Sequence, residues 1–234
     1  GFTQPLFTDI LNIEGLDAGI IGLVDIDEKR LNVNIKLMER ILELMKKDNW
    51  SIEASTDRKE ILKGTDYVID TIEVSGVACV RFDNDIPLKY GIDQCIGDTI
   101  GPGGIMKALR TVPVFLDILR DIEEDCPDAL IMNYTNPMSI MSLAITRSTD
   151  MPYVGLCHSV QWDAKWLANL LGVPEAEIRH RRLDLGLEEA WEPVPVSGVE
   201  DAAYYYSTYN AADRVPVSDR RKIMVLGGVV GRVV

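Results

Sequence analysis

The sequence is short of the residues that build several common kinds of site. It holds two histidines and four cysteines in 234 residues, and 37 acidic residues outnumber 24 lysines and arginines, for a formal net charge of −13. Such an acidic chain disfavours nucleic acid as a partner, because phosphate binding needs a basic face. The cysteines are scattered without a CxxC pair, which argues against a zinc ribbon and against a disulfide framework.

Long apolar runs are lacking too. No run approaches the roughly 18 residues of a membrane span, and no secretory signal is visible. We therefore expect a cytoplasmic protein with no membrane partner. The length suffices for one large domain, or for one domain with an appendage. The chain begins with Gly1 rather than Met, so an upstream segment is expected.

Apolar segments of strand length alternate with segments of helical periodicity. This alternation predicts an α/β fold with a doubly wound, Rossmann-like parallel sheet that lacks its usual first strand. The segment from Glu73 to Gly104, rich in charge and glycine, is predicted as a loop, followed by a helix from about Ile105 to Asp125. The strands are expected at 19–24, 50–54, 67–72, 129–132 and 153–156.

Asp25 follows the first of these strands. An acid at the end of the second strand of a dinucleotide-binding unit can accept hydrogen bonds from the ribose hydroxyls of NAD. Alternatively, Asp27 caps the following helix and Asp25 is simply an acid of the loop. The Gly-rich turn that normally precedes such a unit is absent, although Gly1-Phe2-Thr3 is similar to the last piece of one.

A second Gly-rich segment, Asp98 to Gly104, opens directly into a helix. Free backbone N–H groups and the helix dipole would then point at the loop, which could hold a phosphate, a sugar or a developing negative charge. The alternative is an ordinary turn at a helix start.

Two more candidate segments follow the last two expected strands. Asn136, in Asn133-Tyr134-Thr135-Asn136-Pro137, ends one, and Cys157 with His158 ends the other. Ligands of open α/β sheets bind outside the carboxyl ends of the strands, so a metal ligand, a proton donor and an orienting amide would meet at one edge. The alternative is a buried structural cysteine and a hydrogen-bonded histidine of the core.

Five ordered blocks resemble the NAD- and metal-dependent glycoside hydrolases of family 4 over residues 1–179. The form of the last block is most similar to the α-galactosidase branch of that family. The blocks are Val24 to Asp27, Asp98 to Gly104 together with Ala108 to Thr111, Cys126 to Ala129, Asn133 to Met138 and Gly155 to Gln161.

The resemblance implies a redox-elimination glycosidase acting on a small α-galactoside or a related α-glycoside. In such enzymes NAD⁺ takes a hydride from C3 of the sugar, and a divalent metal, usually Mn²⁺ (manganese), polarises the resulting ketone. By resemblance, Cys157 is a metal ligand, His158 donates a proton to the leaving oxygen, Asn136 binds the sugar and Asp25 holds the ribose of NAD. Assembly into a homo-oligomer is an alternative to a monomer.

The chain also departs from the family. The second metal ligand of the family is a histidine in a Gly-x-Asn-His block that is absent here, and His180 does not match it. The tyrosine base cannot be assigned. Family members are about twice as long. The alternative function is therefore a non-catalytic nucleotide-binding or structural remnant of a fused reading frame.

We predict a domain boundary at residue 179. The glycosidase domain would span 1–179, and a foreign tail that ends in a strand would span 180–234. The tail is similar to the linker of the carbamoyl-phosphate synthetase large subunit. Its segment Lys222 to Leu226 is apolar, of strand length, and followed by Gly227-Gly228. Because the sheet lacks a central strand, which would leave unpaired backbone groups, we predict that this segment inserts in parallel between the strands at Gly19 and Tyr67.

Overall fold

The computed structural model describes residues 3–94, 97–156, 165, 168–170, 172 and 174, the backbone of the strand 221–230 and the side chain of Ile223. Its strands form one six-stranded parallel sheet in the order β2-β1-β6-β3-β4-β5. This confirms the predicted Rossmann-like fold. The strands are β1 (Gly19–Val24), β2 (Trp50–Ser55), β3 (Tyr67–Val74), β4 (Leu130–Asn133), β5 (Tyr153–Gly155) and β6 (Arg221–Val230).

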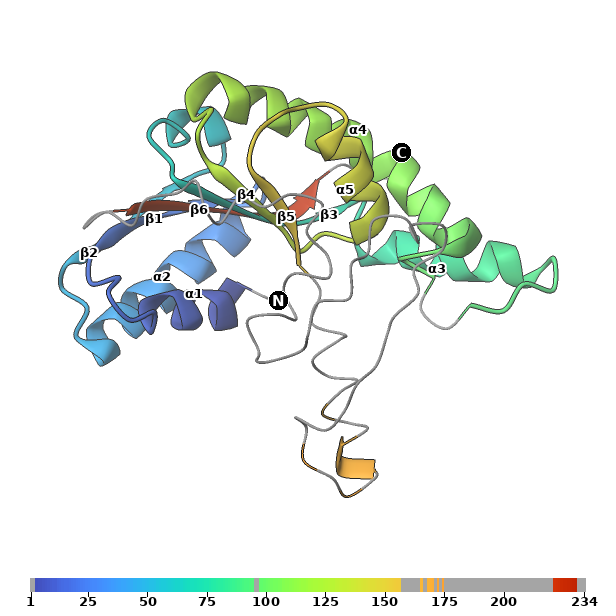
Figure 1. Cartoon of the computed structure of the whole chain (residues 1–234), viewed down its shortest axis with the longest axis horizontal. Helices are drawn as coiled ribbons and strands as arrows, with labels where there is room; N and C mark the ends of the chain where they lie inside the picture. The colour runs from blue at the N-terminus through green and yellow to red at the C-terminus, as the bar shows by residue number, and fades with distance from the viewer. Residues whose placement is uncertain are drawn as a thin grey trace. The chain divides into compact units, whose positions relative to one another are not determined.

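Helices cover both faces of the sheet (Figure 1). On one face α1 and α2 pack over a core that includes Phe7, Met38 and Ile69, and on the other α4 and α5 pack over Val68, Phe115 and Met141. The adjacent residues Val68 and Ile69 of β3 thus point to opposite faces, as the twofold period of a strand requires. The helices are α1 (Thr3–Leu11), α2 (Glu28–Met45), α3 (Val77–Leu88), α4 (Gly101–Asp125) and α5 (Met138–Thr146), with a 3₁₀ turn η1 (Arg58–Glu60).

The strand β6 lies at the centre of the sheet. It pairs in parallel with β1, where Ile21 faces Ile223, and with β3, where Tyr67 faces Ile223. The predicted insertion of Lys222 to Leu226 is therefore confirmed, and Ile223 is buried in the core beside α1 and α2.

The predicted end of β6 is wrong. We expected the strand to stop before Gly227-Gly228, but it continues to Val230. The reason lies in its two neighbours. β1 ends at Val24, which faces Leu226, whereas β3 continues and pairs with Gly227 to Val230 through Thr71 to Val74.

The segment between β3 and α4 is the other difference. The loop predicted from Glu73 to Gly104 contains the helix α3, and α4 begins at Gly101 rather than near Ile105. α3 is hard to see in the sequence because it has no side-chain N-cap and contains Pro87 near its end.

By contacts, the chain divides into one compact unit of residues 1–155 and 208–234 and a second unit of residues 156–207. Every contact described below belongs to the first unit. The domain boundary predicted at residue 179 stays a prediction.

Candidate functional site

A cleft of about 520 Å³ opens at the carboxyl edge of the sheet, between the ends of β1 and β3, the turn after β2 and the middle of α4. Its walls are mostly apolar, with a few polar groups on the side of η1. A cleft of this character suits a flat aromatic ring with a polar rim. It is lined by Val24, Ile26, Thr56, Asp57, Arg58, Ile72, Pro113, Val114, Asp117 and Ile118.

Asp25 lies between two of these lining residues, at the carboxyl end of β1 as predicted. Its side chain is buried, and its Oδ1 accepts a hydrogen bond from the Asp27 N–H at 2.8 Å. The Arg30 guanidinium forms two contacts with the same carboxylate, 2.5 Å to Oδ2 and 3.1 Å to Oδ1. Asp25 therefore fixes the turn between β1 and α2, and any further ligand would share its carboxylate with Arg30.

Asp27 caps α2, as the alternative interpretation of this segment proposed. Its Oδ1 accepts hydrogen bonds from the N–H groups of Lys29 at 3.0 Å and Arg30 at 3.1 Å. The hydrogen bond from the Arg30 N–H is the main cause that lowers the pKa of Asp27. The capped helix start holds Arg30 in place beside Asp25.

The opposite wall of the cleft is fixed by ion pairs. Arg58 of η1 donates from Nε to Asp121 at 2.6 Å and from Nη2 to Asp117 at 2.9 Å, and both acids belong to α4. Lys59 adds a 2.8 Å contact to Asp121. These contacts attach the turn after β2 to α4. This wall of the cleft is therefore fixed by ion pairs between η1 and α4.

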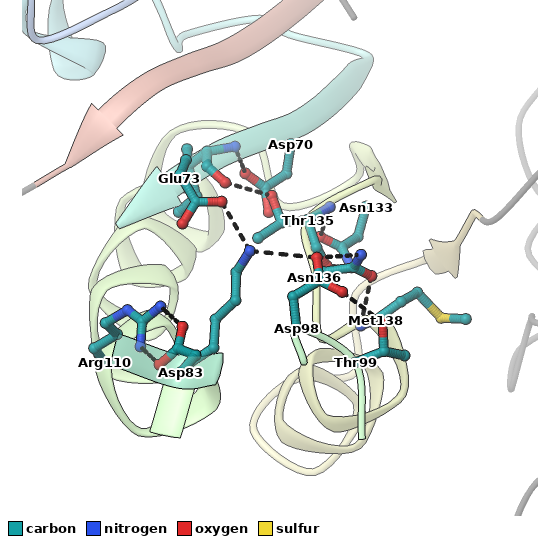
Figure 2. A network of polar contacts seen from close by, with 12 residues as sticks. Asp70, Glu73, Asp83, Asp98, Thr99, Arg110, Asn133, Thr135, Asn136 and Met138 are labelled. Carbon is teal, nitrogen blue, oxygen red and sulfur yellow. Dashed lines mark hydrogen bonds and ion pairs between the residues drawn. The ribbon is translucent and has the colours of Figure 1, made fainter. Parts of the chain in front are cut away.

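A second polar cluster occupies the carboxyl ends of β3 and β4 (Figure 2). Asn136 donates from Nδ2 to Asp98 Oδ2 at 3.0 Å, which joins the loop after β4 to the loop before α4. The Nζ atom of Lys107, on α4, lies 2.8 Å from Glu73 Oε2. It also lies 3.7 Å from Asp98 Oδ2, the oxygen that accepts from Asn136. The structure thus brings Asn136 against the Asp98 segment, whereas the predicted meeting of Asn136 with Cys157 and His158 concerns residues outside the described part of the chain.

The glycines at the start of α4 allow close packing. The Gly103 N–H donates to Gln94 Oε1 at 3.0 Å, so the expected free donor at this position is wrong. A Cβ on Gly103 would lie 2.3 Å from the Gly97 carbonyl oxygen, and one on Gly104 would lie 2.7 Å from the Thr99 carbonyl carbon. The structure therefore favours the ordinary helix start over an anion site.

Sequence reasoning missed Asp70, a fully buried acid in the middle of β3. Its Oδ1 accepts from the Ile72 N–H at 3.2 Å, while Oδ2 has no hydrogen-bond partner among the described residues. Burial raises the pKa of Asp70 to about 7. The available signal was a single charged residue inside the apolar run Tyr67 to Ile72.

Cys157 and His158 lie outside the described residues. The strand that leads to them, β5, ends at Gly155, which faces Asn133 at the carboxyl edge of β4. In the part of the chain that the structure describes, no group of three or more histidine, cysteine or acidic side chains could hold a metal ion. Two further cysteines, Cys79 and Cys126, are not in disulfide bonds.

The comparisons with known proteins decide the family. The model of the family described as "Family 4 glycosyl hydrolase" matches residues 1–173. The chain belongs to this family. The match confirms the resemblance over residues 1–173, which include the strands β1 to β5 and the five sequence blocks. It ends before the tail, so the similarity of residues 180–234 to a synthetase linker stays a prediction.

Family 4 relatives of several kinds are similar to this chain. An α-galactosidase of Rhizobium meliloti is 40% identical over 179 residues, which is 76% of this chain and 36% of the relative. An α-galacturonidase of Thermoanaerobacterium saccharolyticum is 36% identical over 189 residues, 76% of this chain and 40% of the relative. The chain therefore spans less than half the length of these relatives.

The fold also matches a solved structure. A 6-phospho-α-glucosidase from gut microorganisms, determined in complex with NAD and Mn²⁺, superposes with a TM-score of 0.65 at 24% identity, over 76% of this chain and 40% of that one. At this identity the likeness concerns the fold alone.

Within the described residues, no helix of this family 4 chain has the length and apolar character to cross a membrane.

Proposed function

We propose that this chain carries the NAD-binding and sugar-binding portion of a redox-elimination glycosidase that acts on α-galactosides or related α-glycosides. One observation carries the proposal: the apolar cleft at the carboxyl edge of the sheet lies beside an acid, Asp25, that follows a strand. In open α/β sheets this edge is where ligands bind.

The described residues fit the adenosine portion of NAD. The aliphatic walls at Val24, Ile72 and Val114 would pack against the adenine ring, and Asp25 would accept a hydrogen bond from a ribose hydroxyl. When bound, NAD⁺ supplies a hydride acceptor for the sugar. Arg30 orients Asp25 for the ribose through its two contacts with the carboxylate.

For the sugar we propose Asn136 as a binding residue, His158 as the proton donor to the leaving oxygen and Cys157 as a metal ligand. The described residues supply no complete metal site. The proposal of Mn²⁺ therefore rests on the thiolate of Cys157. A thiolate ligand requires a reducing compartment, which is why we propose the cytoplasm.

The sugar class is supported by similarity. The α-galactosidase relative is 40% identical and the α-galacturonidase relative 36%, so an axial galacto-configured hydroxyl at C4 is common to both proposed substrates. The non-catalytic alternative predicts a different result. The chain would bind nucleotide but would not release the aglycone from an aryl α-galactoside, even with NAD⁺, Mn²⁺ and a reductant present.

Titration calorimetry with NAD⁺ tests the cofactor assignment. We expect saturable binding that Val114→Trp weakens by at least about tenfold, because the indole fills the apolar cleft. The matched control is Leu143→Trp on α5, which is 39% exposed and does not line the cleft, and it should bind like the parent chain. Equal affinities of the two variants would place NAD elsewhere, and a lack of any binding would refute the cofactor proposal.

Metal binding is expected to be weak. One thiolate falls short of the roughly three protein ligands of an open catalytic site, so we expect a Mn²⁺ dissociation constant well above about 1 μM under reducing conditions. Electron paramagnetic resonance of free Mn²⁺ measures it directly. A submicromolar affinity that survives Cys157→Ser would show that other residues hold the metal.

A further inference from the structure

Lys107 is a buried cation without a role in the proposed chemistry. It extends from α4, and its side chain is only 5% exposed. Removing an ammonium group from water is costly unless acidic partners compensate it. Two do so: Glu73 at 2.8 Å, from the end of β3, and Asp98 at 3.7 Å, from the loop before α4.

The second of these acids contacts the proposed sugar ligand. Asp98 Oδ2, the oxygen that faces Lys107, accepts the hydrogen bond from Asn136 Nδ2 at 3.0 Å. Its other oxygen accepts from the Thr99 hydroxyl at 2.8 Å. Figure 2 shows Asp98 between Asn136 and Glu73, so one continuous set of contacts runs from β3 to the loop after β4.

Asn136 is held at its amide nitrogen by Asp98, while among the described residues its Oδ1 accepts only a long contact, 3.4 Å, from the Met138 N–H. The orientation of the amide therefore depends mainly on Asp98. With one N–H on Asp98, the second N–H and the oxygen of the amide keep defined directions toward a sugar hydroxyl. An amide free to rotate would lose this selectivity.

We propose that Lys107 is a positioning residue that fixes the amide of Asn136 through Asp98. Without the ammonium group, Glu73 and Asp98 would be two acids facing one partly buried space, and their repulsion would turn Asp98 away from Asn136. The effect of Lys107 on sugar binding rests on the proposed function of Asn136. Its effect on the orientation of the Asn136 amide does not depend on that function.

Nuclear magnetic resonance of the Asn136 side-chain NH₂ group tests the proposal. The signal is assigned by its loss in Asn136→Asp. We expect Lys107→Met to accelerate hydrogen exchange of this group by at least about fivefold, since a hydrogen bond of average strength is lost, and Lys107→Arg to restore most of the protection. The buried Asn133 amide, which donates to the Thr135 carbonyl at 3.2 Å, should not change and reports on the fold.

Two further variants separate positioning from stability. Glu73→Gln with Lys107→Met removes one of the two facing acids and with it their repulsion, so it should restore part of the protection of the Asn136 amide. Lys59→Met removes a surface lysine that pairs with Asp121 and should leave the amide protected. If Asn136 stays protected in a folded Lys107→Met variant, the proposal is wrong.

A titration with methyl α-galactoside connects the amide to the sugar. The parent chain should show saturable shifts at Asn136, and Lys107→Met should weaken the affinity about fivefold or more, with recovery in Lys107→Arg. Absence of binding to the parent chain would refute the proposed sugar site. The hydrogen exchange of the Asn136 amide would still test the positioning role of Lys107. Equal affinities of the parent and Lys107→Met would overturn the role in sugar binding.

Discussion

Deletion of residues 221–234 is expected to abolish cooperative unfolding of the chain. β6 pairs with β1 through six residues and with β3 through eight, so its loss leaves two strand edges unpaired in the middle of the sheet. Each buried backbone group without a partner costs about 1–3 kcal/mol. Several such groups exceed the roughly 5–15 kcal/mol by which a domain is stable. Circular dichroism during heating should show a broad, weak transition.

Two variants make this result specific to the strand. Deletion of residues 231–234 alone, beyond the end of β6, should preserve the transition. Ile223→Ala keeps the backbone pairing but removes a side chain that is 3% exposed, and should cost about 2–5 kcal/mol. A separate peptide of residues 219–232 should restore the transition of the deleted chain. An unchanged melting temperature after the long deletion would contradict the central place of β6.

The insertion of β6 could be predicted because it follows from hydrogen-bond accounting. The alternation of strands and helices predicts a parallel sheet, and the sheet without a central strand needs a partner for both inner edges. Lys222 to Leu226 was apolar and of strand length. The end of the strand could not be predicted in this way, since it depends on β3 continuing beyond β1.

The polar cluster at the carboxyl edge was predictable only in part. The sequence places Asn136 after an apolar run and the Asp98 segment before a helix, and the structure joins the two at 3.0 Å. The contact between Lys107 and Glu73 depends on the rotation of α4 about its axis and on α3, which the sequence pattern did not reveal. Likewise, the pairing of Asp25 with Arg30 required the geometry of the capped turn.

Asp70 leads to the second large effect, a loss of stability as the pH rises. Its pKa is about 7 in the folded chain because burial disfavours the carboxylate, against 3.8 for the exposed group. Below 3.8 both states are protonated, and between 3.8 and about 7 only the folded state holds the proton. The free energy of unfolding therefore falls through this window and levels off above it, by about 4 kcal/mol in total.

Asp70→Asn removes the titrating group and keeps an acceptor for the Ile72 N–H. We expect the parent chain to lose about 2–3 kcal/mol of unfolding free energy between pH 5 and pH 8 through this group, and the variant to lose none of that portion. Urea titrations at unit steps of pH measure the difference. The control Asp17→Asn changes an exposed acid and should follow the parent curve. Parallel curves for Asp70→Asn and the parent would show that Asp70 is already ionised in the folded chain at pH 5 and would contradict its raised pKa.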